Sequence, residues 1–314
     1  MHLMIPHASA LGEACKHSLG TLALPHLSAL MGLLKAEGQA LGSDEYSLNT
    51  PFELALARER GLADTSAPVP TAAWLAAEAG LPSGAGQAWA LLSPMHLAVG
   101  SDQVTAYAPE LLELSEEESR AFFAALAELW PSDEGWQAHW LSPLQWLISH
   151  PSLAGLPSAS LDRVVQRNVA TWMPEARRLR TLQNEAQMLL HRQPLNTARE
   201  ARKALPLNSL WISGCGAESP GAKPLPADLR LDSSLRQPLL MEDWAAWAEA
   251  WARLDDGAVS HLLNEARLGK SVQLTLCGER LARKFILPAR SPLQKTLHRW
   301  LPPRAEVHSL LEGL

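Results

Sequence analysis

The stretch LNSLWISGCG, residues 207–216, is the best candidate for a buried strand in the chain, and it runs directly into Gly214-Cys215-Gly216. In an open α/β sheet, ligands bind beyond the carboxyl ends of the strands, where glycines let backbone amides approach an anion. The alternative is a tight turn whose glycine adopts positive φ without any ligand. Because no helix with a third glycine follows, the segment is not a dinucleotide-binding fingerprint.

The segments on either side of this strand predict an α/β fold. Residues 2–6 and 272–277 are expected to be buried strands, and helical periodicity covers 22–35, 51–61, 175–191 and 241–254. Between them, short strand-like runs at 89–107 and 136–150 surround a helix that begins at Ser115. We therefore expect a core sheet flanked by helices, formed by residues 1–86 and 158–314, with a smaller α+β module inserted at 87–157.

Composition excludes several classes of protein. Of the 314 residues, 47% are hydrophobic, which is far too many for a disordered chain. The 27 basic and 33 acidic residues give a net charge of −6, so nothing attracts the chain to nucleic acid or to an anionic membrane. Three widely spaced cysteines indicate a reducing compartment, and neither a signal peptide nor a membrane span is recognisable. We expect a cytoplasmic protein.

Three groups of residues have both a functional and a structural interpretation. Asn196 and Arg199 precede the main strand and could clamp an anion, or Asn196 could cap a short helix while Arg199 faces water. Cys277 is expected to be a buried thiol rather than a nucleophile, since no histidine is placed beside it. The tryptophans at 244, 247 and 251 share one helical face and predict a core stripe.

Several segments resemble bacterial regulatory proteins of the RpfE type. They are residues 158–216 together with SDQV (101–104), EGWQAHWLSPLQW (134–146) and LTLCGER (274–280). More distantly, HRQPLN, Arg199 and the strand 207–216 are similar to archaeal-type cofactor-independent phosphoglycerate mutases. That resemblance implies an alkaline-phosphatase-like core that binds two divalent metals, a phosphorylatable serine and an inserted substrate-binding module. It also implies that Asn196, Arg199 and Asn208 lie at the substrate cleft.

The chain departs from the mutase pattern at the metal ligands. The family's first strand ends in a metal-binding Asp, and His7 stands at the matching position. Residues 227–314 contain no Asp-Gly-His or paired-His arrangement, and Ser43 corresponds only loosely to the nucleophilic serine. Two-metal phosphoryl transfer needs several carboxylates and imidazoles around the ions. The resemblance therefore implies the fold without the chemistry.

These observations lead to one hypothesis and two alternatives. The hypothesis is a catalytically degenerate mutase relative, without metal or other cofactor, that acts as a regulatory or small-anion-sensing protein with a possible protein partner. The first alternative is an active mutase or phosphatase that uses two divalent metals, and the second is a protein–protein adaptor with exposed tryptophans. The residues expected to contact a ligand are His7, Ser43, Asn196, Arg199, Asn208, Gly214 and Gly216.

Overall fold

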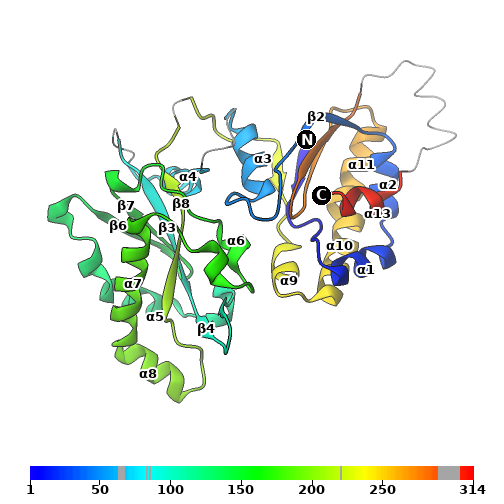
Figure 1. Cartoon of the computed structure of the whole chain (residues 1–314). Coiled ribbons are helices and arrows are strands. Elements are labelled where there is room, and N and C mark those ends of the chain that lie inside the picture. Colours follow the sequence, from blue (N-terminus) through cyan, green and yellow to red (C-terminus); the bar gives the residue numbers. More distant parts are fainter. Residues whose placement is uncertain (63–67, 83, 85, 220, 289–304) are drawn as a thin grey trace. The chain divides into compact units, whose positions relative to one another are not determined.

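The computed structural model describes residues 1–62, 68–82, 84, 86–219, 221–288 and 305–314. The chain divides into two compact units (Figure 1). Unit 1 comprises residues 1–60 and 223–314, and unit 2 comprises residues 61–222. The insertion in the middle of the chain is therefore wider than the 87–157 expected from the sequence.

Unit 1 is built on a five-stranded mixed sheet in the order β2-β11-β10-β1-β9. β1 pairs in parallel with β9 and β10, while β11 runs antiparallel to β10 and β2. The α/β class predicted from the sequence is confirmed for this unit. Its strands are β1 (His2–Ile5), β2 (Lys35–Leu41), β9 (Leu229–Leu231), β10 (Gln273–Cys277) and β11 (Ala282–Ile286).

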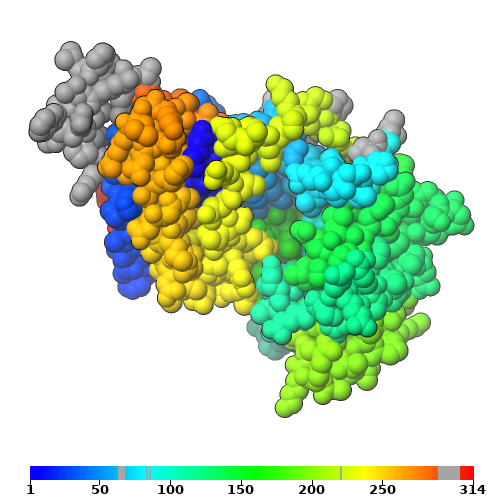
Figure 2. Space-filling model, turned by 180° about the vertical axis from the view of Figure 1, so that it is seen from behind, coloured from blue at the N-terminus to red at the C-terminus, as the bar shows by residue number. Residues whose placement is uncertain are grey.

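Helices cover both faces of this sheet. Leu3, Ile5, Leu274 and Leu276 point to the main core, where five helices supply the opposing side chains, and α3 packs on β10 and β11. In Figure 2 the blue N-terminal atoms lie beside orange atoms from the C-terminal part of the chain, although these segments are far apart in sequence. The helices are α1 (Glu13–Thr21), α2 (Pro25–Met31), α3 (Pro51–Glu59), α9 (Arg236–Leu240), α10 (Trp244–Leu254), α11 (Ser260–Arg267) and α13 (Val307–Glu312).

Local signals explain where several of these helices begin. Thr50 forms a capping box with Glu53 ahead of Pro51, as the sequence predicts. Trp247 and Trp251 of α10 are fully buried in the core, which confirms the predicted stripe. The predicted helix over 22–35 is too long: α2 ends at Met31, and the exposed strand β2 follows because Gly32 and Leu33 close the helix. Strand β2 escaped prediction because most of its residues are exposed and it lacks apolar alternation.

Unit 2 contains a separate four-stranded antiparallel sheet in the order β6-β7-β3-β8. The strand at 207–216 is β8, and it pairs with β3 rather than with the sheet of unit 1. The expectation that it belongs to the core sheet is wrong, because burial alone does not identify a strand's partner. The strands are β3 (Trp89–Met95), β6 (Gln137–Ser142), β7 (Gln145–Ser149) and β8 (Ser209–Gly216), with a small hairpin formed by β4 (Leu97–Val99) and β5 (Val104–Ala106).

The sheet of unit 2 also has helices on both faces. The long α7 and the shorter α5 pack against Leu92, Trp146 and Ile212, whereas α4 packs against Trp89 and Leu147. Ser115 and Glu118 form the predicted capping box at the start of α5. The helices are α4 (Thr71–Glu78), α5 (Glu116–Ala125), α6 (Leu161–Val164), α7 (Arg177–His191) and α8 (Pro194–Ala201), and η5 (Val169–Trp172) is a short 3₁₀ turn before α7.

Among the described residues, no helix is long and apolar enough to cross a membrane.

Candidate functional site

The carboxyl ends of the parallel strands in unit 1 are where the fold would place a ligand. β1 is followed by Pro6 and His7, β9 by Asp232, and β10 by Gly278 and Glu279. His7 adopts a φ of 60°, and its carbonyl accepts a hydrogen bond from the indole of Trp247 at 3.2 Å. The backbone turns sharply at this position and is held there by α10.

The two carboxylates at this edge are bound to backbone groups of separate turns. Asp232 accepts hydrogen bonds from the amide and the hydroxyl of Ser234, and Glu279 accepts one from the amide of Leu11 at 2.8 Å. These side chains do not form a group of three metal-ligating atoms within the described residues. The edge holds acidic groups that organise loops rather than a cluster that converges on an ion.

Ser43 lies in an exposed turn after β2. Its hydroxyl hydrogen-bonds to the carboxylate of Asp44 at 3.3 Å and to the hydroxyl of Ser47 at 2.9 Å. The hydrogen bond from the amide of Tyr46, with smaller contributions from Ser47 and Ser43, holds the pKa of Asp44 below its usual value. The neighbours that the structure gives Ser43 belong to this turn.

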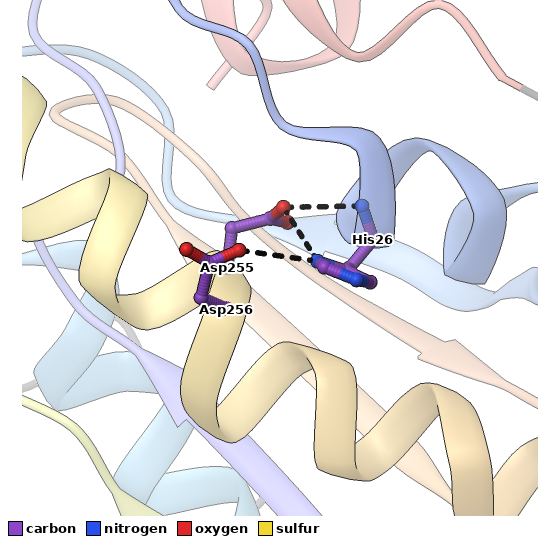
Figure 3. Close-up of side chains that lie close together, drawn as sticks. All are labelled: His26, Asp255 and Asp256. Carbon is purple, nitrogen blue, oxygen red and sulfur yellow. Dashed lines mark hydrogen bonds and ion pairs between the residues drawn. The ribbon is translucent and has the colours of Figure 1, made fainter.

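One group of residues in unit 1 has the composition of a metal site (Figure 3). His26, Asp255 and Asp256 each offer one ligand atom, and these atoms lie within 4.8 Å of one another. The Nδ1 of His26 is 3.1 Å from Asp255 and 3.6 Å from Asp256. Metal bonds of roughly 2.1 Å place neighbouring ligand atoms at comparable separations. This is the set in the described part of the chain that could hold a cation.

The hydrogen bonds of Asp255 give this cluster a structural role. Asp255 is buried in a π-helical turn, η6 (Asp255–Val259), between α10 and α11. Its two oxygens accept the backbone amides of His26 and Leu27 at 3.1 and 2.7 Å, as well as the imidazole of His26. These amides belong to the first turn of α2, where no intrahelical acceptor is available, so Asp255 caps that helix from a distant part of the sequence.

Asn196 and Asn208 lie in unit 2 and use their amides on the protein's own backbone. Asn196 donates to the carbonyls of Leu190 and Leu207 and accepts the amide of Leu207, all within 3.0 Å. Asn208 makes a reciprocal pair with the backbone of Leu97 at 2.7 and 3.0 Å. Asn196 does not cap the short helix α8, whose N-cap is Gln193; its side chain joins the last turn of α7 to the start of β8, and Asn208 also fixes the start of that strand.

The structure contradicts both interpretations of Arg199 that the sequence offered. Its side chain neither faces water nor points into an open cleft where it could clamp an anion. Its guanidinium is fully buried and donates to the carbonyls of Leu205 and Leu112 and to the carboxylate of Glu118. Partial burial opposes ionisation of Glu118, but hydrogen bonds from Arg202 and Arg199 outweigh it and lower the pKa of that carboxyl. Arg199 thus ties α8 to the first turn of α5.

The packing around Gly214 and Gly216 differs from the anion site that the sequence suggested. A Cβ at Gly214, which has a φ of 63°, would clash with the hydroxyl of Thr71 and lie 2.9 Å from the amide of Ala72. A Cβ at Gly216 would lie 2.9 Å from Pro70. The glycines therefore let β8 approach the start of α4, and helix packing explains them without an anion.

The three cysteines are buried free thiols. Burial raises the pKa of Cys215 to about 12 and raises that of Cys277 further, so neither is a thiolate at neutral pH. The expectation of a buried thiol at position 277 is confirmed.

Comparison with known proteins establishes the fold and nothing finer. The chain is similar to the PH0037 protein from Pyrococcus horikoshii, with a TM-score of 0.52 and 13% identity over 98% of this chain and 91% of that one. A cofactor-independent phosphoglycerate mutase from Thermoplasma acidophilum matches with a TM-score of 0.39 and 10% identity, over 98% of this chain and 94% of that one. No protein-family model and no curated protein sequence matches the chain.

A cleft in unit 2 was missed by sequence reasoning. It has a volume of about 780 Å³ and lies among the β4–β5 hairpin, η5 and α7. Asn184, Gln187 and His191 of α7 line it. Their spacing of three and four residues places them on one face of the helix, and this polar stripe was the available sequence signal.

Proposed function

We propose that this chain is a non-catalytic, regulatory relative of the cofactor-independent phosphoglycerate mutases. The sequence resemblance to those enzymes and to regulatory proteins of the RpfE type supports the ancestry. The observation that carries the loss of catalysis is the position after β1, where an imidazole, His7, stands in place of the expected metal-binding Asp. The carboxylates of Asp232 and Glu279, which also follow strands of this sheet, accept hydrogen bonds from the loop amides of Ser234 and Leu11.

The chemistry of two-metal phosphoryl transfer explains why this substitution matters. Two cations about 4 Å apart need several anionic ligands to balance their charge. An imidazole supplies no negative charge, and Ser43 lies in an exposed turn where its acidic hydrogen-bond partner is Asp44. Activation of a serine and stabilisation of a phosphoryl group both need that missing charge.

The adaptor alternative loses the contact residues on which it rested. No tryptophan within the described residues is exposed, and the exposed large apolar side chains there are mostly scattered singly over both units. Trp300 lies outside the described residues. The regulatory proposal therefore favours recognition of a small ligand over a tryptophan-based protein contact.

Metal content and turnover test this proposal directly. We expect purified full-length protein to contain far less than one equivalent of manganese or zinc, and to leave 3-phosphoglycerate unconverted when either metal is added. Ser43→Ala provides the control, because residual conversion that this variant retains comes from a contaminating mutase. Two equivalents of metal with turnover that Ser43→Ala abolishes would overturn the proposal.

A further inference from the structure

The cleft of unit 2 has the size and the walls of a small-molecule site. Its volume of about 780 Å³ lies within the range of roughly 300 to 1,000 Å³ typical of such sites. One part of its wall is the polar face of α7, and the rest comes from the β4–β5 hairpin and the segment around η5. All of these residues belong to unit 2, so the site does not depend on unit 1.

The charge of the lining argues against a phosphorylated or other anionic ligand. Among the described residues no lysine or arginine lines the cleft, whereas the carboxylates of Asp102 and Glu200 and the imidazole of His191 do. Phosphate sites use arginine, lysine or a ring of backbone amides to balance the negative charge. The side chain expected to supply that charge, Arg199, is committed to Leu205, Leu112 and Glu118.

The amides of the lining divide into two sets. Asn196 and Asn208 have used both their donors and acceptors on backbone groups. Within the described residues the side chain of Asn184 makes no hydrogen bond. The side-chain amide of Gln187 donates to the hydroxyl of Ser209, and the side-chain oxygen of Asn168 accepts from the amide of Ala170, so Gln187 keeps its oxygen and Asn168 its NH2 group available. The lining therefore combines amides that are bonded to the protein's own backbone with amides whose donors or acceptors remain available to a ligand.

Apolar side chains complete the lining. Val99 is 83% exposed and Met173 is 39% exposed, and Leu97 and Val104 also line the cleft. A ligand that matches both features has a flat apolar face and an edge carrying neighbouring donors and acceptors. Asparagine and glutamine amides pair with such edges on nucleobases, and carboxylates accept hydrogen bonds from ribose hydroxyls.

We propose that this cleft binds an uncharged nucleoside, with Asn184 and Gln187 contacting the edge of the base and Asp102 or Glu200 the ribose. This site goes beyond the proposed loss of catalysis in unit 1, and either proposal can fail without the other. A nucleotide fits less well, because its phosphate would meet the carboxylates of Asp102 and Glu200 in a lining that offers the imidazole of His191 but, among the described residues, no lysine or arginine.

Calorimetric titration of the full chain tests the site with adenosine, guanosine, cytidine and uridine, each beside its 5′-monophosphate. We expect at least one nucleoside to bind with a dissociation constant below about 1 mM and its monophosphate to bind several-fold more weakly. Asn184→Asp should weaken that nucleoside by about tenfold, since it replaces a donor with an acceptor at the base edge.

Asn264→Asp is the matched control. It makes the same chemical change at an exposed position of α11 in unit 1, and should leave nucleoside binding unchanged. The proposal is overturned if no nucleoside binds, if a monophosphate binds as tightly as its nucleoside, or if the two variants weaken binding equally. A far-ultraviolet circular dichroism spectrum identical to that of the unaltered chain excludes misfolding of Asn184→Asp, whose side chain is exposed.

Discussion

Two sets of polar side chains in unit 2 have similar chemistry and opposite roles. Asn196, Arg199 and Asn208 bond to the protein itself, and the first two are buried. Asn184 and Gln187, on the neighbouring α7, keep donors and acceptors available in the cleft. The difference teaches that residue type does not identify a binding group. What decides is whether nearby backbone groups already need that side chain.

The same distinction applies within unit 1. Asp255 and Asp256 are adjacent in sequence, and both approach His26. Asp255 is buried and caps α2, whereas the side chain of Asp256 is 79% exposed. Four predictions, from the largest expected effect to the smallest, test whether residues that bond to or pack against the protein itself have a structural role.

Arg199→Met should lower the free energy of unfolding by about 4 kcal/mol. It removes the donor that the carbonyls of Leu205 and Leu112 and the carboxylate of Glu118 share. Arg202→Met removes an exposed partner of the same carboxylate and should cost less than about 1 kcal/mol. Urea denaturation measures both. Similar values for the two variants would mean that Arg199 is not the structural member of the pair.

Asp255→Ala should lower the free energy of unfolding by about 3 kcal/mol, since it removes a helix cap and leaves buried amides unsatisfied. Asp256→Ala serves as the control and should change stability by less than about 0.5 kcal/mol. Thermal unfolding followed by circular dichroism compares them. A larger loss for Asp256→Ala would assign the cluster a role other than capping α2.

His2 makes the stability of the protein depend on pH. It is buried beside the hydroxyl of Thr275, and Glu59 and Lys284 also face it. Burial lowers its pKa from 6.5 to about 4, although Glu59 opposes this shift. Because the unfolded chain binds the proton first, stability is complete above pH 6.5 and is lost as the pH falls toward 4.

The size of that loss follows from the shift in pKa, and is at most about 3 kcal/mol. Urea denaturation at pH 7, 5.5 and 4.5 measures it, and His2→Gln should show a shallower decline over this range. Equal slopes for the variant and the unaltered chain would contradict the assignment of this pH dependence to His2.

Gly214→Ala should lower the free energy of unfolding by about 2 kcal/mol more than Gly135→Ala. Both glycines have positive φ, but a Cβ at Gly135 meets no atom within 4 Å, whereas one at Gly214 meets α4. The control therefore isolates the steric contact from the strain of the backbone. Equal losses of stability in the two variants would contradict the packing role of Gly214.

Much of the fold was predictable because its signals are local. The capping boxes at Thr50 and Ser115, the tryptophan stripe of α10 and the strands β1 and β10 all follow from spacing within a few residues. The strand with which β8 pairs could not be predicted, because the sequence of a fully buried strand is equally compatible with either sheet. The wider insertion at residues 61–222 is a consequence of that pairing.

The candidate site was less predictable, since whether a polar side chain is free to bind a ligand depends on residues far away in the sequence. Asn196 and Arg199 were candidates because of their residue types, but their hydrogen-bond partners Leu207 and Glu118 lie 11 and 81 residues away. Asn184 and Gln187 formed a readable polar stripe, yet nothing in the sequence placed the β4–β5 hairpin beside it. Asp255 caps a helix that begins 230 residues earlier, at Pro25.

The sequence by itself determined the α/β class, the starts of the capped helices and the absence of an expected carboxylate at His7, because each depends on residue identity or short-range spacing. The tertiary structure alone decided which strands share a sheet and which polar side chains are consumed by the backbone. Those outcomes depend on contacts between distant segments, where every buried donor and acceptor must find a partner before any remains for a ligand.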